Sequence, residues 1–355
     1  MIINAGPLTE LLTLILETAG AERERARICA DHLVSANLKG HDSHGVGMAP
    51  SYVAWIRTGK LHPNARPKVI SDRGAVMVVD GQFGLGAPVA RETTEMAIAR
   101  AKQIGIACVA LRNSCHIGRI GTYGEQCADA GLISMHHVNV VGGPPTVAPY
   151  GGREARMLTN PYCCAVPRKG GEHIVLDFAT SAVAMGKLRV AFLKGEPAPV
   201  GVLVDAEGRP TTDLSTFYRA EARSLLLPFG LHKGGGMQIL CELLGGALAG
   251  QWTMQPGSDR AFGAAVNNML SVVIDPDAFG GRERFEAEAE AMLDYISSTA
   301  PAEGIDKVRL PGDPERESTA RRLAEGIPID DGTWAQLREA ALSVGLDEAA
   351  LSRFG

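Results

Sequence analysis

The sequence lacks the short motifs that mark several common enzyme classes. It contains no GxSxG nucleophile elbow and no HExxH helix, so α/β-hydrolases and zinc peptidases lose their strongest sequence support. A phosphate-binding GxxxxGK[ST] loop is also missing, because Ser181 stands where the first glycine would precede Gly186-Lys187. The chemistry of this chain must therefore rest on other residues.

Excess charge and long apolar runs are missing as well. Charged residues make up 21% of the chain and the net charge is −5, which predicts no basic surface for nucleic acid or membranes. No apolar run reaches transmembrane length, and the first residues lack the basic segment of a signal peptide. We expect a soluble, cytoplasmic protein that binds neither nucleic acid nor membranes.

The seven cysteines show no CxxC and no spacing typical of a metal site. Such a scattered, odd set favours a reducing compartment, and we expect no bound metal. Glycine, by contrast, is abundant, with 42 residues concentrated in short loops. That abundance favours tight turns and close approaches of the backbone to a ligand.

Hydrophobic periodicity predicts an α/β protein. Apolar residues at three- and four-residue spacing predict helices over 8–21 and 26–38. Short buried strands alternate with helices through the middle of the chain, and the tail is charged and helical. We predict an α/β domain over 76–274, flanked by a helical domain built from residues 1–75 and 275–355.

The stretch from Gly40 to Tyr52 follows the N-terminal helices and carries Ser43 and His44. Histidine has an unperturbed pKa near neutral pH, so a turn that aims its imidazole is suited to proton transfer. The alternative is a polar helix-to-loop turn in which His41 and Asp42 only cap helix ends.

A Rossmann fingerprint is the first test for a nucleotide site, and it fails. Gly84-Leu-Gly86-Ala-Pro-Val89 follows a predicted strand and opens a helix, but Val89 occupies the third small position. The next strand ends in Arg112 where the fingerprint requires an acid.

Four further polar segments lie beside predicted strands or at helix starts: 113–119, 159–161, 177–181 and 232–236. The last three can present backbone N–H groups to an anion. Capping of a helix or turn is the alternative for Thr180-Ser181 and for Thr159-Asn160.

Taken together, these motifs resemble the malate/L-lactate dehydrogenase family, which is unrelated to the Rossmann lactate dehydrogenases. The resemblance covers nearly the whole chain, and the order and spacing of the motifs make it specific. It rests on GHDSHGV (40–46), VDG (79–81), NSCHIG (113–118), VAPYGG (147–152), TNP (159–161), LDFATS (176–181), GK (186–187), GRPTTD (208–213), HKG (232–234) and PGDPE (311–315). The details Gly47-Met48 and 118–121 are most similar to the hydroxycarboxylate dehydrogenase B branch.

The resemblance implies a fold, a reaction and an assembly. The fold would be a three-layer α/β core with a mixed sheet, as in L-sulfolactate dehydrogenase, with residues 76–274 binding the nicotinamide cofactor. The reaction would be reversible hydride transfer between NAD or NADP and C2 of a 2-oxo acid. The protein would be a homodimer with its sites near the interface.

The resemblance also assigns roles to residues. His44 would donate and accept the proton, with Ser43 and Asp177 as relay or orienting partners, and Tyr52 and His116 would line the substrate pocket. The residues bordering the cofactor would be Thr159, Asn160, Phe178, Ala179, Thr180, Ser181, Lys187, His232, Lys233, Gly234, Gly312 and Glu315.

One departure from the family bears on the substrate. Many relatives carry an arginine at the position of Met48, where it is thought to hold the substrate carboxylate. We hypothesise that Arg119 supplies this guanidinium and that Met48 leaves room for a bulky or aromatic substrate side chain.

Other functions remain open at this stage. A cyclic imine reductase of the same family is the first alternative. A metal-dependent lyase or hydrolase built on His41, His44, His116 and His136 is more remote, as is a non-catalytic ligand-binding protein. The sequence does not fix the natural substrate or the preference between NADH and NADPH.

Overall fold

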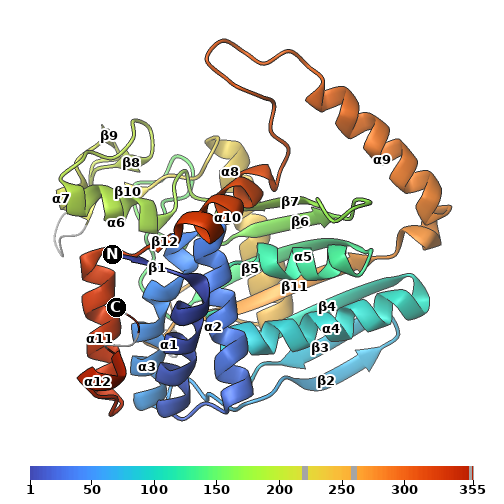
Figure 1. Cartoon of the computed structure of the whole chain (residues 1–355). Coiled ribbons are helices and arrows are strands. Elements are labelled where there is room, and N and C mark those ends of the chain that lie inside the picture. Colours follow the sequence, from blue (N-terminus) through green and yellow to red (C-terminus); the bar gives the residue numbers. More distant parts are fainter. Residues whose placement is uncertain (218–222, 257–261, 352–353, 355) are drawn as a thin grey trace.

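A seven-stranded mixed sheet forms the centre of the molecule in the computed structural model, which describes residues 1–217, 223–256, 262–351 and 354 (Figure 1). In spatial order the strands are β2 (Lys68–Arg73), β3 (Val76–Asp80), β4 (Ile106–Cys115), β11 (Val266–Ile274), β5 (Ile133–Val141), β6 (Tyr162–Val166) and β7 (Ile174–Phe178). Within this sheet β3 and β4 run parallel, and the other neighbouring strands are antiparallel. The predicted α/β class with a mixed sheet is confirmed.

Strand β11 lies at the centre of this sheet although it comes late in the chain. The sequence pattern alone predicts a strand only over 270–274, and asparagines such as Asn267 and Asn268 are depleted in strands. Both amides are buried in the sheet and accept hydrogen bonds from backbone N–H groups at the end of β4. The strand is therefore longer than predicted, since its partners satisfy these polar side chains.

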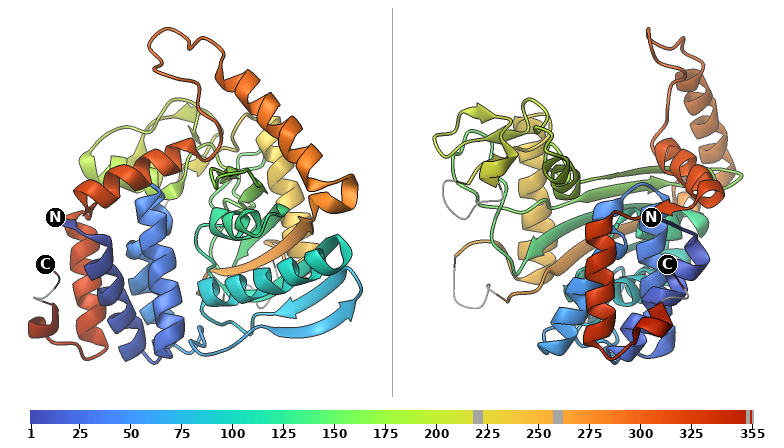
Figure 2. Two further views of the ribbon diagram at one scale, coloured as in Figure 1. Left: turned by 45° about the vertical axis from the view of Figure 1, so that its right-hand side comes forward. Right: turned by 60° about the vertical axis from the view of Figure 1, so that its left-hand side comes forward.

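Helices cover both faces of the sheet (Figure 2). On one face α4 (Gly86–Ile104) and α5 (Gly121–Asp129) bury a core of small and aliphatic side chains with Tyr123. On the other face α8 (His232–Cys241) continues into the π-helix η3 (Glu242–Gly250), which lies across β4, β5 and β11. The sheet is thus the middle of three layers.

A separate helical body joins the two ends of the chain. It contains α1 (Ala5–Thr18), α2 (Arg23–Leu38), α3 (Ala49–Arg57) and α11 (Asp331–Ser343), packed around leucines of α1 and α2. Strands β1 (Ile2–Ile3) and β12 (Ile327–Pro328) pair beside it. The two predicted N-terminal helices are confirmed, because their apolar stripes are the buried residues of α1 and α2.

The remaining elements surround these two bodies. Short helices η1 (Asp42–His44), η2 (Val46–Met48) and η4 (Pro276–Phe279) occupy connections, and α12 (Glu348–Leu351) follows α11. A small sheet of β10 (Leu225–Leu226), β8 (Leu203–Val204) and β9 (Pro210–Thr211) packs with α6 (Met185–Lys194) and α7 (Leu214–Phe217). Helix α9 (Arg282–Ser297) buries no residue, and α10 (Asp313–Glu325) returns to contact α2. The domain boundaries at 75 and 275 stay a prediction.

Burial of histidine in the sheet predicts acid sensitivity. His136 of β5 is fully buried, with its ring nitrogens 2.8 Å from Ser271 Oγ and 3.0 Å from Ser134 Oγ. Burial, followed by the influence of His137, lowers the pKa of His136 to about 3. The unfolded chain therefore binds this proton near pH 6.5 while the folded protein stays neutral, so stability falls as the pH drops from about 6.5 towards 3.

Replacing His136 with glutamine should weaken this pH dependence. We expect urea unfolding of His136→Gln to show a lower free energy of unfolding at pH 8, because hydrogen bonds to the two serines change. Between pH 6 and 4.5 the free energy of unfolding of the variant should fall less steeply with decreasing pH than that of the wild type. The difference in slope should be up to about 1.4 kcal/mol per pH unit. Equal slopes for both proteins would contradict this account.

Candidate active site

Three predicted site residues from different elements form one hydrogen-bonded chain. His44 Nδ1 of η1 lies 3.2 Å from Nε2 of His116, and the two rings stack at 11° with centroids 5.3 Å apart. His116 Nδ1 in turn lies 2.7 Å from the hydroxyl oxygen of Tyr52 on α3. The structure therefore brings the predicted proton donor together with two predicted substrate residues.

The segment that carries His116 is anchored on both sides. Ile117 N donates a hydrogen bond to Asn267 Oδ1 over 2.9 Å, and Arg119 N donates to His32 Nε2 over 3.0 Å. Sequence reasoning missed Asn267 and His32 because neither belongs to a polar motif. Their only signal is a polar side chain at a buried position of a helix or strand, and that signal does not identify the hydrogen-bond partner.

Burial sets the protonation of the histidine pair. Burial, then the charges of His41 and Arg119, lower the pKa of His44 to about 4, although the residue as a whole is half-buried. Burial also holds the pKa of His116 well below its usual range. Both imidazoles are therefore neutral at pH 7, and His44 can accept a proton from a hydroxyl group. Burial raises the pKa of Tyr52, which stays protonated.

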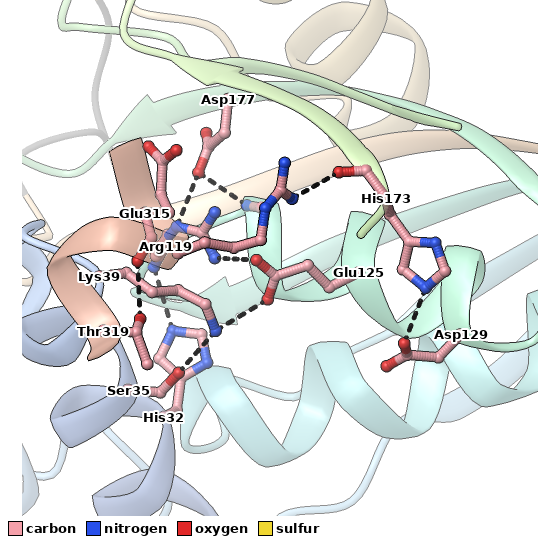
Figure 3. A network of polar contacts seen from close by, with 12 residues as sticks. His32, Ser35, Lys39, Arg119, Glu125, Asp129, His173, Asp177, Glu315 and Thr319 are labelled. Atoms are coloured by element: carbon pink, nitrogen blue, oxygen red, sulfur yellow. Dashed lines mark hydrogen bonds and ion pairs between the residues drawn. The ribbon is translucent and has the colours of Figure 1, made fainter. Parts of the chain in front are cut away.

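Asp177 belongs to a buried ionic network beside this pair (Figure 3). Its Oδ2 accepts a hydrogen bond from Gly121 N over 2.9 Å and lies 3.3 Å from Arg119 Nε. Burial raises the pKa of Asp177, and the Arg119 guanidinium opposes that rise. Its predicted action on His44 stays a prediction, because the contacts of Asp177 are those with Arg119 and Gly121.

Arg119 is the centre of the same network. Its side chain is 1% exposed, and Nη1 lies 2.9 Å from Oε1 of Glu125, whose Oε2 lies 3.0 Å from Lys39 Nζ (Figure 3). The guanidinium thus faces two carboxylates of the protein itself. These contacts favour a role in holding Asp177, whereas its hypothesised contact with a substrate carboxylate stays a prediction.

The other two residues predicted at this site flank the pair. Ser43 is half-buried next to His44 in η1, and Met48 of η2 packs half-buried against the apolar core of the helical body. Met48 follows His44 by four residues in the sequence.

A second group of predicted residues gathers at the end of β7. Thr180 donates to the carbonyl oxygen of Thr159 through both N and Oγ1, over 2.9 and 2.8 Å. Asn160 has a positive φ of 26° and donates from Nδ2 to Glu242 Oε2 over 2.7 Å. Ala179 lies between Thr180 and Phe178, and Ser181 bridges to Pro228.

The start of α8 lies beside this group. Phe178 meets Phe229 edge to face at 5.1 Å, and a Cβ on Gly234 would lie 2.0 Å from Phe229 O, so only glycine fits there. His232 and Lys233 are exposed in the first turn of α8. A positively charged side chain at the start of a helix suits a phosphate, so the place of these residues beside the cofactor stays a prediction.

The remaining predicted cofactor residues lie closer to the His44 turn. Glu315 Oε1 is 2.9 Å from His41 Nε2, and Gly312 precedes it at the start of α10. Lys187 is exposed on α6, which contacts η1. Between the two groups runs β7, where Val175 N donates to Pro311 O over 3.1 Å.

The four histidines considered for a metal site do not converge. His136 lies inside the sheet between two serines, whereas His41 pairs with Glu315 and His44 with His116. In the described ranges of the chain, no three His, Cys, Asp or Glu side chains are arranged to hold a metal ion.

Among the helices of those same ranges, none has the length and apolar character to span a membrane.

Comparison with known proteins places the chain in a class. Residues 3–338 match the family described as malate/L-lactate dehydrogenase. Hydroxycarboxylate dehydrogenase B of Escherichia coli (strain K12) is 42% identical over 356 residues, covering 99% of this chain and 96% of that protein. L-lactate dehydrogenase of Cupriavidus necator is 40% identical, covering 96% of this chain and 97% of its own length. The structure of sulfolactate dehydrogenase from Methanocaldococcus jannaschii superposes with a TM-score of 0.88 at 32% identity, covering 100% and 99% of the two chains.

These matches define an oxidoreductase that acts on 2-hydroxy acids with NAD or NADP as acceptor. The chain belongs to the malate/L-lactate dehydrogenase family.

Proposed function

We propose that this protein interconverts a 2-oxo acid and its 2-hydroxy acid, with His44 as the group that moves the proton. The hydrogen-bonded chain from His44 through His116 to Tyr52 carries this proposal. It provides a neutral, half-buried imidazole held by two neighbouring side chains. When bound, NAD or NADP would accept the hydride from C2 of the hydroxy acid, or NADH or NADPH would supply it to the oxo acid.

The protein's own residues handle the oxygen at C2. In oxidation, neutral His44 takes the hydroxyl proton, and in reduction it returns that proton to the same oxygen. An anionic substrate raises the pKa of His44, because a nearby carboxylate stabilises the imidazolium. His116 orients His44 through the bond to Nδ1, and Tyr52 fixes His116. Arg119 holds Asp177, which in turn binds Gly121 N.

The residues predicted to bind the cofactor form two groups. The first turn of α8, with His232, Lys233 and Gly234, would receive a phosphate, while the loop with Thr159 and Asn160 would border the remainder. These residues do not distinguish NAD from NADP, because no contact in the described part of the chain identifies where the adenine ribose would bind.

The substrate class follows from Met48. The apolar thioether of Met48 packs against the same core cluster as Trp55 and Ile56, and it favours a bulky or aromatic side chain on the 2-oxo acid. We further propose a homodimer, supported by α9, where Met292 is 54% and Tyr295 75% exposed on a helix without buried residues. Sedimentation as a monomer at micromolar concentration would refute the dimer.

Loss of absorbance at 340 nm tests the proposed reaction. We expect oxidation of NADH or NADPH with 2-oxo acids from pyruvate through oxaloacetate to phenylpyruvate, with the highest kcat/KM for the bulky acids. Preference for oxaloacetate would keep the reaction and reject the argument from Met48. Turnover of a cyclic imine alone, with no oxo acid reduced, would replace the proposed function by imine reduction.

A further inference from the structure

Two residues of the turn that carries His44 have no role in the chemistry proposed above. His41 and Asp42 directly precede Ser43 and His44, and both point to the same helix, α10. His41 Nε2 lies 2.9 Å from Glu315 Oε1, and Asp42 receives both ends of the Arg322 guanidinium over 2.6 and 3.0 Å. Glu315 and Arg322 are seven residues apart and therefore share one face of α10.

A side chain of α2 holds the turn from its other side. Asn37 is buried, its Nδ2 donates to Asp42 Oδ1 over 2.6 Å, and its Oδ1 accepts from Val46 N over 2.8 Å. One amide thus bridges the residues before and after His44. A Cβ on Gly45 would lie 2.2 Å from Asn37 Oδ1, so the backbone approaches this amide as closely as glycine permits.

Helix α10 is itself fixed to the strand that carries Asp177. Val175 N of β7 donates to the carbonyl oxygen of Pro311 just before α10, and Arg316 Nη1 of α10 donates over 2.9 Å to the carbonyl oxygen of His173 just before β7. The same helix therefore contacts β7 at its first turn and the His44 turn along its length. Its position sets the distance between these two parts of the site.

We infer that Asn37, Asp42 and Arg322 are positioning residues that hold the His44 imidazole against His116, with α10 as the common support. The effect on catalysis rests on the proposed function, whereas the effect on the position of His44 can be tested without it. The pairing is a bidentate Arg–carboxylate contact, which fixes orientation as well as distance. Rotation of the turn by a small amount would separate His44 from His116, and a misplacement of about 1 Å can cost about 100-fold in rate.

The test uses the full chain with Arg322→Met, Asp42→Asn and the double variant. We expect each single change to lower kcat by about 10-fold with KM values unchanged, because binding groups lie elsewhere. The loss in the double variant should be smaller than the product of the two single losses, because both changes break the contact between Arg322 and Asp42. Arg322→Lys keeps the positive charge but loses the planar guanidinium that makes two hydrogen bonds. Its kcat should lie between those of the wild type and Arg322→Met. Arg338→Met is the matched control: it removes the exposed pair between Arg338 of α11 and Glu348 of α12, and it should keep wild-type kcat.

A second measurement does not depend on turnover. Diethyl pyrocarbonate modifies neutral imidazoles, and mass spectrometry gives the rate at each histidine. We expect modification of His44 to accelerate several-fold in Arg322→Met and Asp42→Asn, while buried His136 stays protected. Wild-type rates at His44 in both variants would overturn the inference, as would losses of kcat that multiply in the double variant. If the wild type reduces no substrate, the proposed function fails, and the modification rates alone decide whether the turn is held in this way.

Discussion

Replacement of His44 by alanine should lower kcat for 2-oxo acid reduction by about 10²- to 10⁴-fold, the usual contribution of a positioned proton-transfer group. The imidazole of His44 is half-buried and is held by His116. Binding of the cofactor should change little, because the residues proposed to hold it lie at the end of β7 and the start of α8. Stopped-flow and steady-state assays with purified variant measure both quantities.

The control for this experiment is His62→Ala. His62 is an exposed histidine whose ring contacts Phe83 and the carbonyl oxygen of Gln82, away from the His44 turn. It should retain wild-type kcat. A His44→Ala protein with normal kcat would remove the histidine pair from the mechanism.

The pH profile gives the same prediction a second readout. Because burial lowers the pKa of His44 to about 4, the free enzyme carries a neutral base throughout the neutral range. We expect kcat/KM for hydroxy acid oxidation to stay level from pH 7 to about 5 and to fall as the pH approaches 4. The sign follows because protonation removes the base, and an unperturbed histidine would show the fall near 6.5.

Substitution of Gly86 by alanine should impair both stability and turnover. Gly86 opens α4, and a Cβ there would lie 2.0 Å from His116 O and 2.4 Å from Cys115 O. The backbone of the His116 segment, or α4 itself, must move to accommodate the methyl group. We expect a loss of about 1–3 kcal/mol in the free energy of unfolding and about a 100-fold lower kcat, since His116 shifts relative to His44.

Gly6→Ala is the matched control for this substitution. Gly6 also lies in the first turn of a helix, α1, and nothing lies within 4 Å of a Cβ added there. Its stability should be unchanged or slightly higher, because alanine is the better helix former. A Gly86→Ala protein that unfolds and turns over like Gly6→Ala would show that the close contact is unimportant.

The sequence by itself determined the local chemistry and the broad class. The alternation of short strands and helices predicted the α/β class, and the apolar stripes of residues 8–38 predicted α1 and α2. Motif order identified the family and selected His44, His116 and Tyr52, which the fold brings together. These features depend on neighbours in sequence or on motifs read directly from the chain.

Only the tertiary structure decided what each polar side chain contacts. Arg119 is adjacent in sequence to the substrate motif, yet burial directs its guanidinium to Asp177 and Glu125. The failed dinucleotide fingerprint at Gly86 proved to be a close approach between α4 and the His116 segment, which periodicity cannot reveal. Asp42 meets Arg322 across 280 residues of chain. Such long-range pairs are set by how helices and sheet pack in three dimensions, and no local pattern encodes the partner.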